Sequence, residues 1–410
     1  MANDWRPSTW GDEVTLEYGK AIRGYSQTHG KYRVFGSNGP IGWTSDALTQ
    51  GPGVVLGRKG AYRGVEFCRE PFWVIDTAYY VVPKTDLEMR WLYYAVKHYK
   101  LGEVDDGSPI PSTTRAAVYM LELDVPPKHE QQAISRILGT LDDKIELNRK
   151  ENETLEAMAR ALFKAWFVDF EPVRAKLEGR WQRGQSLPGL PAHLYDLFPE
   201  RLAESELEVI PEGWKIRSLD SIANYLNGLA LQKFPPESDE EFLPVIKIAQ
   251  LRAGNTNGAD KASTQIKPEY VVVDGDVLFS WSGSLEVEVW NGGPGALNQH
   301  LFKVTSNEVP KWFYFFATRQ HLSDFRAIAA GKATTMGHIQ RKHLTDARIA
   351  VAPPESMKQF DAVIASQFDQ LVSNAQQSRS LAQLRDTLLH KLISGELRVP
   401  DAERIVGVAI

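Results

Sequence analysis

Residues 128–170 read KHEQQAISRILGTLDDKIELNRKENETLEAMARALFKAWFVDF, and the apolar side chains recur at alternating spacings of four and three. So narrow a stripe is typical of a coiled-coil seam, in which the partner is another long helix. The positions on the stripe are Ile134, Leu138, Leu141, Ile145, Asn148, Asn152, Leu155, Ala159, Leu162 and Trp166. We therefore expect a long helix that packs against a second one.

A second stripe with the same spacing begins at Phe360. Its positions are Phe360, Ile364, Gln367, Leu371, Asn374, Ser378, Leu381, Arg385, Leu388 and Leu392. Each stripe follows a pair of prolines, at 126–127 and at 353–354. Proline is excluded from a helix interior, so each pair fixes where its helix can begin. The repetition predicts a duplicated chain in which each half ends in one strand of a coiled coil.

Composition limits the class of protein. A chain of 410 residues with 43% hydrophobic content can bury more than one core, and its length favours two or three domains. The single cysteine, Cys68, excludes an intramolecular disulfide, which fits a cytoplasmic protein. No stretch reaches the length of a membrane span. The net charge of -5 gives no global sign of a polyanion partner, so a nucleic-acid interface must rest on local patches.

The globular parts combine strand and helix patterns. Residues 72–75 and 78–82 are rich in aromatic and β-branched side chains and predict strands, whereas residues 87–101 have helical spacing. The plan repeats from Pro211 after a connector, 171–210, that contains several Pro and Gly residues and little periodicity. The sequence predicts two α+β domains on one scaffold.

Positive charge is concentrated locally in each half. The candidate DNA-binding residues are Lys31, Arg33, Arg58, Lys59 and Arg63 in the first half, and Arg319, Arg326, Lys332, Arg341 and Lys342 in the second. A solvated surface is the alternative for either cluster alone. Two clusters in two repeats of an otherwise acidic chain favour contact with phosphates.

Four further side chains of the second half have the chemistry to touch base edges. They are Trp281, Asn298, Gln299 and His300. The alternative is that a strand-borne aromatic ring or a buried amide belongs to the core.

Polar residues interrupt both stripes near the middle. A buried asparagine in a seam lowers stability and fixes register. If the helices are antiparallel, Asn148 faces the Ser378 layer and Asn152 faces the Asn374 layer. The alternative is a break in the stripe that is exposed to solvent.

The end of the first stripe carries more apolar surface than one seam covers. The residues are Met158, Phe163, Trp166, Phe167 and Phe170. This excess predicts contact with a partner subunit.

Patterns for catalysis are absent from the sequence. We find no glycine-rich cofactor loop, no Walker lysine, no Asn-Pro-Pro-aromatic methyltransferase signature and no zinc spacing. Asp142, Asp143 and Lys144 resemble a nuclease cluster, but their helical positions favour surface charge. Any chemistry is expected to come from partners, with no metal and no cofactor on this chain.

Several motifs resemble one family. Residues 130–170 look like the central conserved region of type I restriction-modification specificity subunits. Pro211-Glu-Gly-Trp is similar to the entry to a target-recognition domain, and Leu297-Asn-Gln-His and Met336-Gly-His-Ile look like elements within one. Leu388-Leu-His-Lys-Leu-Ile-Ser-Gly-Glu-Leu resembles the C-terminal ending. The first domain departs from the pattern, with Asp76-Thr-Ala-Tyr-Tyr where the second has Asn-Gln-His.

The resemblance implies a subunit that reads a bipartite double-stranded DNA target, one half-site per domain. It implies an α+β fold in which an antiparallel coiled coil with pseudo-two-fold symmetry sets the spacer. It also implies two methyltransferase subunits, which bind S-adenosylmethionine, and nuclease/translocase subunits as partners. The implied segments are target-recognition domain 1 at 1–127, the central long helix at 128–170, a connector at 171–210, target-recognition domain 2 at 211–353, the C-terminal long helix at 354–399 and a tail at 400–410. The alternative function is a non-catalytic coiled-coil scaffold that presents two protein-interaction modules.

Overall fold

The computed structural model describes residues 4–105, 107, 111–205, 209–331 and 337–409. The chain divides into two compact units. Unit 1 holds residues 1–145 and 380–410, and unit 2 holds residues 146–379. Among the described residues, no helix is both long enough and apolar enough to cross a bilayer.

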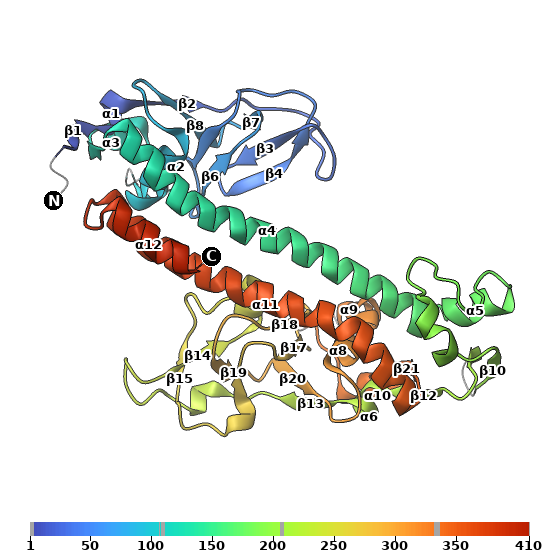
Figure 1. Cartoon of the computed structure of the whole chain (residues 1–410). Helices are drawn as coiled ribbons and strands as arrows, with labels where there is room; N and C mark the ends of the chain where they lie inside the picture. The colour runs from blue at the N-terminus through green and yellow to red at the C-terminus, as the bar shows by residue number, and fades with distance from the viewer. Residues whose placement is uncertain (1–3, 106, 108–110, 206–208, 332–336, 410) are drawn as a thin grey trace. The chain divides into compact units, whose positions relative to one another are not determined.

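Two helices of 40 residues each are the longest elements, α4 at Lys128–Phe167 and α11 at Pro354–Ile393 (Figure 1). Both begin directly at the proline pairs, where a missing N–H costs nothing because the first turn has no intrahelical acceptor. Because the units divide after residue 145 and after residue 379, each long helix contributes to both of them. The predicted segments had kept each helix separate from the domains.

Both helices end earlier than the sequence predicts. α4 stops at Phe167 and not at residue 170, because Phe170 takes a left-handed backbone with φ 53° at the start of α5, Glu171–Leu177. α11 stops at Ile393 and not at residue 399, and Gly395 follows with φ 70°. The expected tail is mostly helical, as α12, Val399–Ala409. Ala402 of that helix is buried in the core of unit 1.

Unit 1 is built on a four-stranded antiparallel sheet in the order β2-β8-β5-β6 and a three-stranded sheet in the order β4-β3-β7. A separate ladder pairs β1 with β9, and α2 lies against β5 and β6. The predicted strands at 72–75 and 78–82 correspond to β7 and β8. The bounds are β1 Arg6–Thr9, α1 Trp10–Glu13, β2 Val14–Tyr18, β3 Tyr32–Gly36, β4 Gly39–Thr44, β5 Gly53–Gly57, β6 Val65–Cys68, β7 Phe72–Val74, β8 Ala78–Pro83, α2 Met89–His98, η1 Leu101–Glu103, α3 Arg115–Tyr119, β9 Glu122–Val125 and α12 Val399–Ala409.

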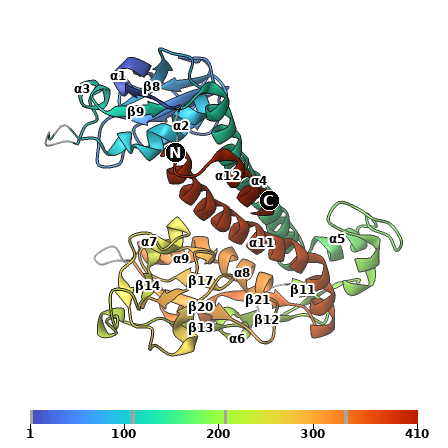
Figure 2. The same ribbon diagram turned by 60° about the vertical axis from the view of Figure 1, so that its left-hand side comes forward.

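Unit 2 repeats this plan, with sheets in the orders β13-β20-β17-β18 and β15-β14-β19-β16. Strands β13, β14, β17 and β20 are labelled in Figure 2. Ladders pair β12 with β21 and β10 with β11. The bounds are η2 Ala192–Leu197, β10 Leu202–Glu204, β11 Val209–Pro211, β12 Lys215–Ser218, α6 Leu219–Ile222, β13 Asn224–Asn227, η3 Leu231–Lys233, β14 Leu243–Ile246, α7 Ile248–Ala253, β15 Lys261–Ala262, η4 Pro268–Tyr270, β16 Val271–Val272, β17 Val277–Ser280, β18 Val287–Val289, β19 Gly295–Leu297, β20 Leu301–Thr305, α8 Lys311–Gln320, α9 Leu322–Ala330, α10 Arg341–Asp346 and β21 Arg348–Val351.

Strand register makes the two units comparable residue by residue. Tyr18 lies opposite Tyr79 in unit 1, as Asn227 lies opposite Phe302 in unit 2. The smaller sheets each contain one parallel pair, β3 with β7 and β14 with β19. The predicted duplication is therefore confirmed in the order and direction of the strands, although the side chains differ.

The first half of α4 is tied into unit 1 by ionic and polar contacts. Asp142 accepts a hydrogen bond from Arg385 of α11 at 2.8 Å and another from the Tyr94 hydroxyl at 2.5 Å. Asp143 pairs with Arg90 at 2.6 Å. Asp142 is half-buried and bonds to α11, so plain surface charge does not describe it. Asp143 is exposed, as the sequence predicts, and is paired with Arg90.

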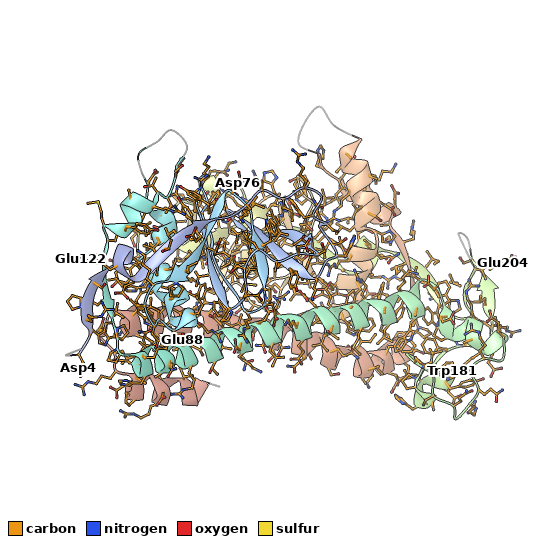
Figure 3. The ribbon with its side chains drawn as sticks, turned by 90° about the horizontal axis from the view of Figure 1, so that it is seen from above. Asp4, Asp76, Glu88, Glu122, Trp181 and Glu204 are labelled. Atoms are coloured by element: carbon orange, nitrogen blue, oxygen red, sulfur yellow. The ribbon has the colours of Figure 1, made fainter. Side chains whose placement is uncertain are left out.

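The N-terminus of α2 is fixed against α4 by one carboxylate. Glu88 (labelled in Figure 3) accepts from the backbone N–H of Trp91 at 2.5 Å and from the Ser135 hydroxyl of α4. Trp91 then lies in the same buried cluster as Ile134 and Leu138. The helix cap and the apolar contact together position α2 under the strands of the large sheet.

The connector is folded and not a loose linker. Trp181 (labelled in Figure 3), Leu194 and Phe198 are buried in the core of unit 2. The Phe198 ring lies 5.6 Å from the ring of Trp166 of α4 and 4.8 Å from that of Phe360 of α11. The sequence reading missed this because proline and glycine mark turns but say nothing about what the side chains between them bury.

The aromatic end of α4 is covered by this chain itself. Phe163, Trp166, Phe167 and Phe170 are buried within unit 2. Only Met158 of the predicted group remains half exposed, at 50%. The expectation that these aromatic residues contact a partner subunit is therefore wrong, because the connector and the helices of unit 2 cover them.

The predicted seam positions differ in burial. Those that are buried are Ile134, Leu138, Leu141, Asn148, Ile364, Asn374, Leu381 and Leu388. Those that are half-buried are Ile145, Asn152, Leu155, Leu162 and Leu371. In unit 2, increasing residue number along α4 meets decreasing number along α11, because Asn148 reaches Ser378 and Asn152 reaches Leu371. The helices are antiparallel there, as the sequence predicts.

Candidate nucleic-acid interface

In unit 1, two arginines and two tyrosines form a stacked cluster at the ends of β2, β5 and β8. The guanidinium of Arg58 lies 5.0 Å from the ring centre of Tyr18 and 5.8 Å from that of Tyr79. The guanidinium of Arg115 lies 4.1 Å and 6.0 Å from the same two ring centres. Tyr18 is 45% exposed, so the cluster reaches the surface. Stacked guanidinium groups keep their in-plane donors available for a ligand.

Arg115 is positioned by a capped helix. It is the first residue of α3, where the Thr114 hydroxyl accepts from the backbone N–H of Ala117 at 3.3 Å. The Nε of Arg115 donates to the carbonyl oxygen of Leu16 at 2.6 Å. A more distant partner is the Glu17 carboxylate, at 3.6 Å. An arginine has five N–H donors, so the bond to Leu16 leaves the remaining four for other contacts.

The tyrosine below these arginines stays protonated. Burial and the neighbouring Tyr18 raise the pKa of Tyr79 to about 12. The Tyr79 hydroxyl donates to the carbonyl oxygen of Thr113 at 3.2 Å, which ties β8 to the segment that leads into α3. The cluster therefore carries its positive charge on the two arginines.

Unit 2 has an arginine in the corresponding place. Arg341 is the first residue of α10, and its Nη2 donates to the carbonyl oxygen of Tyr225 at 3.0 Å. Its guanidinium lies 5.7 Å from the ring centre of Phe302. Tyr225 and Phe302 occupy on β13 and β20 the positions that Leu16 and Tyr79 occupy on β2 and β8.

Beside Arg341 lies a polar and aromatic cluster. Trp281 donates from Nε1 to the side-chain oxygen of Asn227 at 2.9 Å and to the carbonyl oxygen of Gln299 at 3.2 Å. Its ring centre is 5.9 Å from that of His300, which also contacts the Ser282 hydroxyl at 3.0 Å. Three of the predicted base-contacting residues are thus together. Asn298 is buried, and its Oδ1 accepts from the His300 backbone, which is a core role.

Three further predicted cations of unit 1 lie in or beside strands, with Arg33 in β3, Lys31 just before it and Lys59 after β5. Arg33 stacks on Trp43 with 4.5 Å between the guanidinium and the ring centre, and the amine of Lys31 lies 5.0 Å from the centre of Tyr32. Lys59 is exposed just beyond β5. These three predicted residues remain candidates for phosphate contact.

Three predicted cations have partners inside the chain. Arg63 donates to the carbonyl oxygen of Gly102 at 2.5 Å. Arg319 pairs with Glu156 of α4 at 2.8 Å, and Arg326 pairs with Glu286 at 2.9 Å. A count of local charge cannot distinguish such structural pairs from free surface cations. Lys342 is exposed, whereas Lys332 and Met336 lie outside the described residues.

Sequence reasoning missed Tyr18, Arg115 and Asn227. Arg115 lies far along the chain from the first basic cluster, and only strand pairing brings it beside Arg58. The one signal available was the alignment of the two halves, in which Arg115 and Arg341 both open the short helix before the last strand. Among the described residues, no group of three or more His, Cys, Asp or Glu side chains is arranged to hold a metal ion.

Comparison with known proteins agrees with this architecture. The chain is 26% identical over 334 residues to the specificity subunit of the type I restriction enzyme MjaIX of Methanocaldococcus jannaschii, covering 78% of this chain and 72% of that one. It is 25% identical over 346 residues to the specificity subunit of the type I restriction enzyme HindI of Haemophilus influenzae, covering 73% and 74%. Both alignments span most of the two chains.

A solved structure shares the fold. The S subunit of a type I restriction-modification system from M. genitalium superposes with a TM-score of 0.57 at 16% identity, covering 95% of this chain and 96% of that one. The family model of the type I restriction modification DNA specificity domain matches twice, at residues 4–157 and 211–384. The chain therefore belongs to the type I restriction modification DNA specificity domain family.

Proposed function

We propose that this chain is the DNA sequence-specificity subunit of a type I restriction-modification complex, and that each unit reads one half of a bipartite target. The observation that carries the proposal is the repeated scaffold. Arg115 and Arg341 occupy corresponding positions, and the side chains around them differ. Two domains that bind one polymer at two different sequences need such a combination of a shared backbone contact and different base contacts.

The electrostatic part of binding is assigned to cations that face solvent. Lys31, Lys59 and Lys342 are exposed, and the guanidinium of Arg33 lies 4.5 Å from the centre of the Trp43 ring. Each phosphate that a cation neutralises releases counterions, so affinity arises locally even though the whole chain carries a net charge of -5.

The partners supply the chemistry in this proposal. Two methyltransferase subunits bind S-adenosylmethionine and modify the target, and nuclease/translocase subunits cut. This chain contributes binding, and α4 with α11 sets the gap between half-sites. We place the complex in the cytoplasm, where bacterial and archaeal DNA is found.

The test is a binding titration of the chain assembled with its methyltransferase subunits, at several salt concentrations. We expect the logarithm of the binding constant to fall linearly with the logarithm of the salt concentration, and one DNA sequence to compete better than scrambled DNA. The control is the methyltransferase subunits without this chain, which should show no sequence preference. Binding without salt dependence or sequence preference would instead favour the coiled-coil scaffold that presents two protein-interaction modules.

A further inference from the structure

The strand register of the two large sheets shows which residue of unit 2 is equivalent to a given residue of unit 1. Tyr18 corresponds to Asn227, because each lies opposite the equivalent residue of the neighbouring strand. Gly57 lies opposite Ala78 as Ser280 lies opposite Leu301, so Gly57 and Ser280 are equivalent. Arg58 and Trp281 directly follow them and are therefore equivalent too. The backbone agrees, since the N–H of Arg58 donates to Thr77 and that of Trp281 donates to His300.

The segments that lead into α3 and α10 are also equivalent. The N–H of Thr113 donates to the carbonyl oxygen of Arg58, and the N–H of Ile339 donates to that of Trp281. These bonds place Arg115 and Arg341 two residues further along, at the same point of each domain. Each of these arginines donates to the corresponding strand carbonyl and covers the corresponding ring.

The strand register and these bonds define three pairs of equivalent positions, which differ in whether the two units carry the same residue type. The arginine is the same in both units, whereas the other two positions change from tyrosine to asparagine and from arginine to tryptophan. A phosphate is identical at every step of DNA, and a base edge is not. A contact to phosphate therefore tolerates the same side chain in both domains, whereas a contact to a base must change when the half-site changes.

On this basis, and resting on the proposed function, we propose that Arg115 and Arg341 bind phosphate and that positions 18 and 58 read one half-site while positions 227 and 281 read the other. Arg58 has the chemistry for guanine, to whose O6 and N7 a guanidinium donates. Its guanidinium lies over the rings of Tyr18 and Tyr79, and its Nε–H is buried without an acceptor among the described residues.

Asn227 is oriented for a different contact. Its side-chain oxygen already accepts from the Trp281 indole at 2.9 Å. The amide N–H₂ is then turned away from the indole and is available as a donor to an acceptor on a base edge. The indole of Trp281 fixes that orientation, so Trp281 is a positioning residue as well as a surface that a base or sugar can cover.

The reading positions are tested by sequencing the methylated sites produced by the complex with Arg58→Ala and, separately, with Asn227→Ala. Each variant should relax the preference at one or more positions of a single half-site by about tenfold, and the two variants should affect different half-sites. The unaffected half-site in each variant shows that the complex has assembled. Unchanged preference in both half-sites, or loss in the same half-site for both variants, would overturn the assignment.

The phosphate positions are tested by Arg115→Gln and Arg341→Gln, with Arg341→Lys as the matched control. Each Gln variant should weaken binding to target and non-target DNA by the same factor and lower the salt slope by about one unit. The Lys variant should keep the slope. A change in base preference, or an unchanged slope, would overturn the phosphate role. The wild-type complex tests the proposed function itself, because it should modify a bipartite site whichever way these variants behave.

Discussion

Asn374 of α11 donates a hydrogen bond from its side-chain nitrogen to the side-chain oxygen of Asn152 of α4, at 3.0 Å. One turn away, Asn148 donates to Gln377 at 2.8 Å and to the hydroxyl of Ser378 at 3.3 Å. The two layers are those expected from the sequence for antiparallel helices. A slip of either helix would separate these partners and leave buried amides unpaired, so the polar layers fix the register.

Removing both partners of this layer should destabilise the protein by less than the sum of the two single removals. We expect Asn374→Ala to lower the free energy of unfolding by about 1–3 kcal/mol, because the side-chain oxygen of Asn152 loses its donor in a partly buried site. The double variant Asn152→Leu with Asn374→Leu should lose less than the sum of the two single Leu variants. Denaturant unfolding measures both, and strictly additive losses would show that the two amides do not act as a pair.

Two cations in unit 2 should have opposite roles. Lys342→Glu should lower the salt slope of DNA binding by about one unit and leave the melting temperature unchanged, because Lys342 is exposed. Arg319→Ala should lower the melting temperature and leave the slope unchanged, because Arg319 pairs with Glu156 at 2.8 Å. The reverse pattern would contradict the division between binding and structural cations.

The length of the helices should set the gap between half-sites. Inserting four residues after Ile145 of α4 and four after Arg379 of α11, where the units divide, adds about 6 Å to each helix and keeps both stripes nearly in phase. On a duplex that rises ~3.4 Å per base pair, we expect a gap longer by roughly one or two base pairs and the same half-sites. Sequencing of modified sites measures this gap.

A control insertion of the same four residues after the exposed Asp239 leaves both helices intact and should leave the gap unchanged. Altered half-sites with the original gap, in the helix variant, would show that the helices do not act as the spacer.

The pair His98 and His390 predicts a pH dependence of stability in unit 1. Their Nδ1 atoms lie 3.3 Å apart, and burial, followed by the charge of His390, lowers the pKa of His98. A lowered folded-state pKa means that the stabilisation is present above the unfolded value of about 6.5 and is lost as the pH falls through the folded value. His98→Gln should therefore flatten the fall in melting temperature below about pH 6.5.

The matched control is His193→Gln, since His193 is an exposed histidine in unit 2. It should leave the pH profile of the melting temperature as it is in the wild type. A profile that falls equally steeply with and without His98 would assign the acid sensitivity to other groups.

The sequence predicted what is periodic and missed what depends on tertiary contact. The four-three spacing found both long helices, and the proline pairs found where they begin. The ends of both helices were predicted too late in the sequence. Phe170 and Gly395, which follow the two helices, have a positive φ, and side-chain spacing does not encode that backbone conformation. The burial of Trp181 in the connector was not predicted, because it depends on contacts with residues distant in sequence.

The candidate interface shows the same division. Local charge counting found Arg58 and Arg341, but it also included Arg63 and Arg319, whose partners are a distant carbonyl and a distant carboxylate. It missed Arg115, which only strand pairing brings beside Arg58. Residues assembled from several strands can be recognised from sequence only when the register between those strands is known.

The central claim is most directly tested by sequencing the modified bases in the DNA of a host that expresses this chain together with its methyltransferase subunits. The account predicts one motif made of two short half-sites separated by a gap of fixed length, and no such motif when this chain is omitted. The same modified motif with and without the chain, or a single undivided motif, would contradict it.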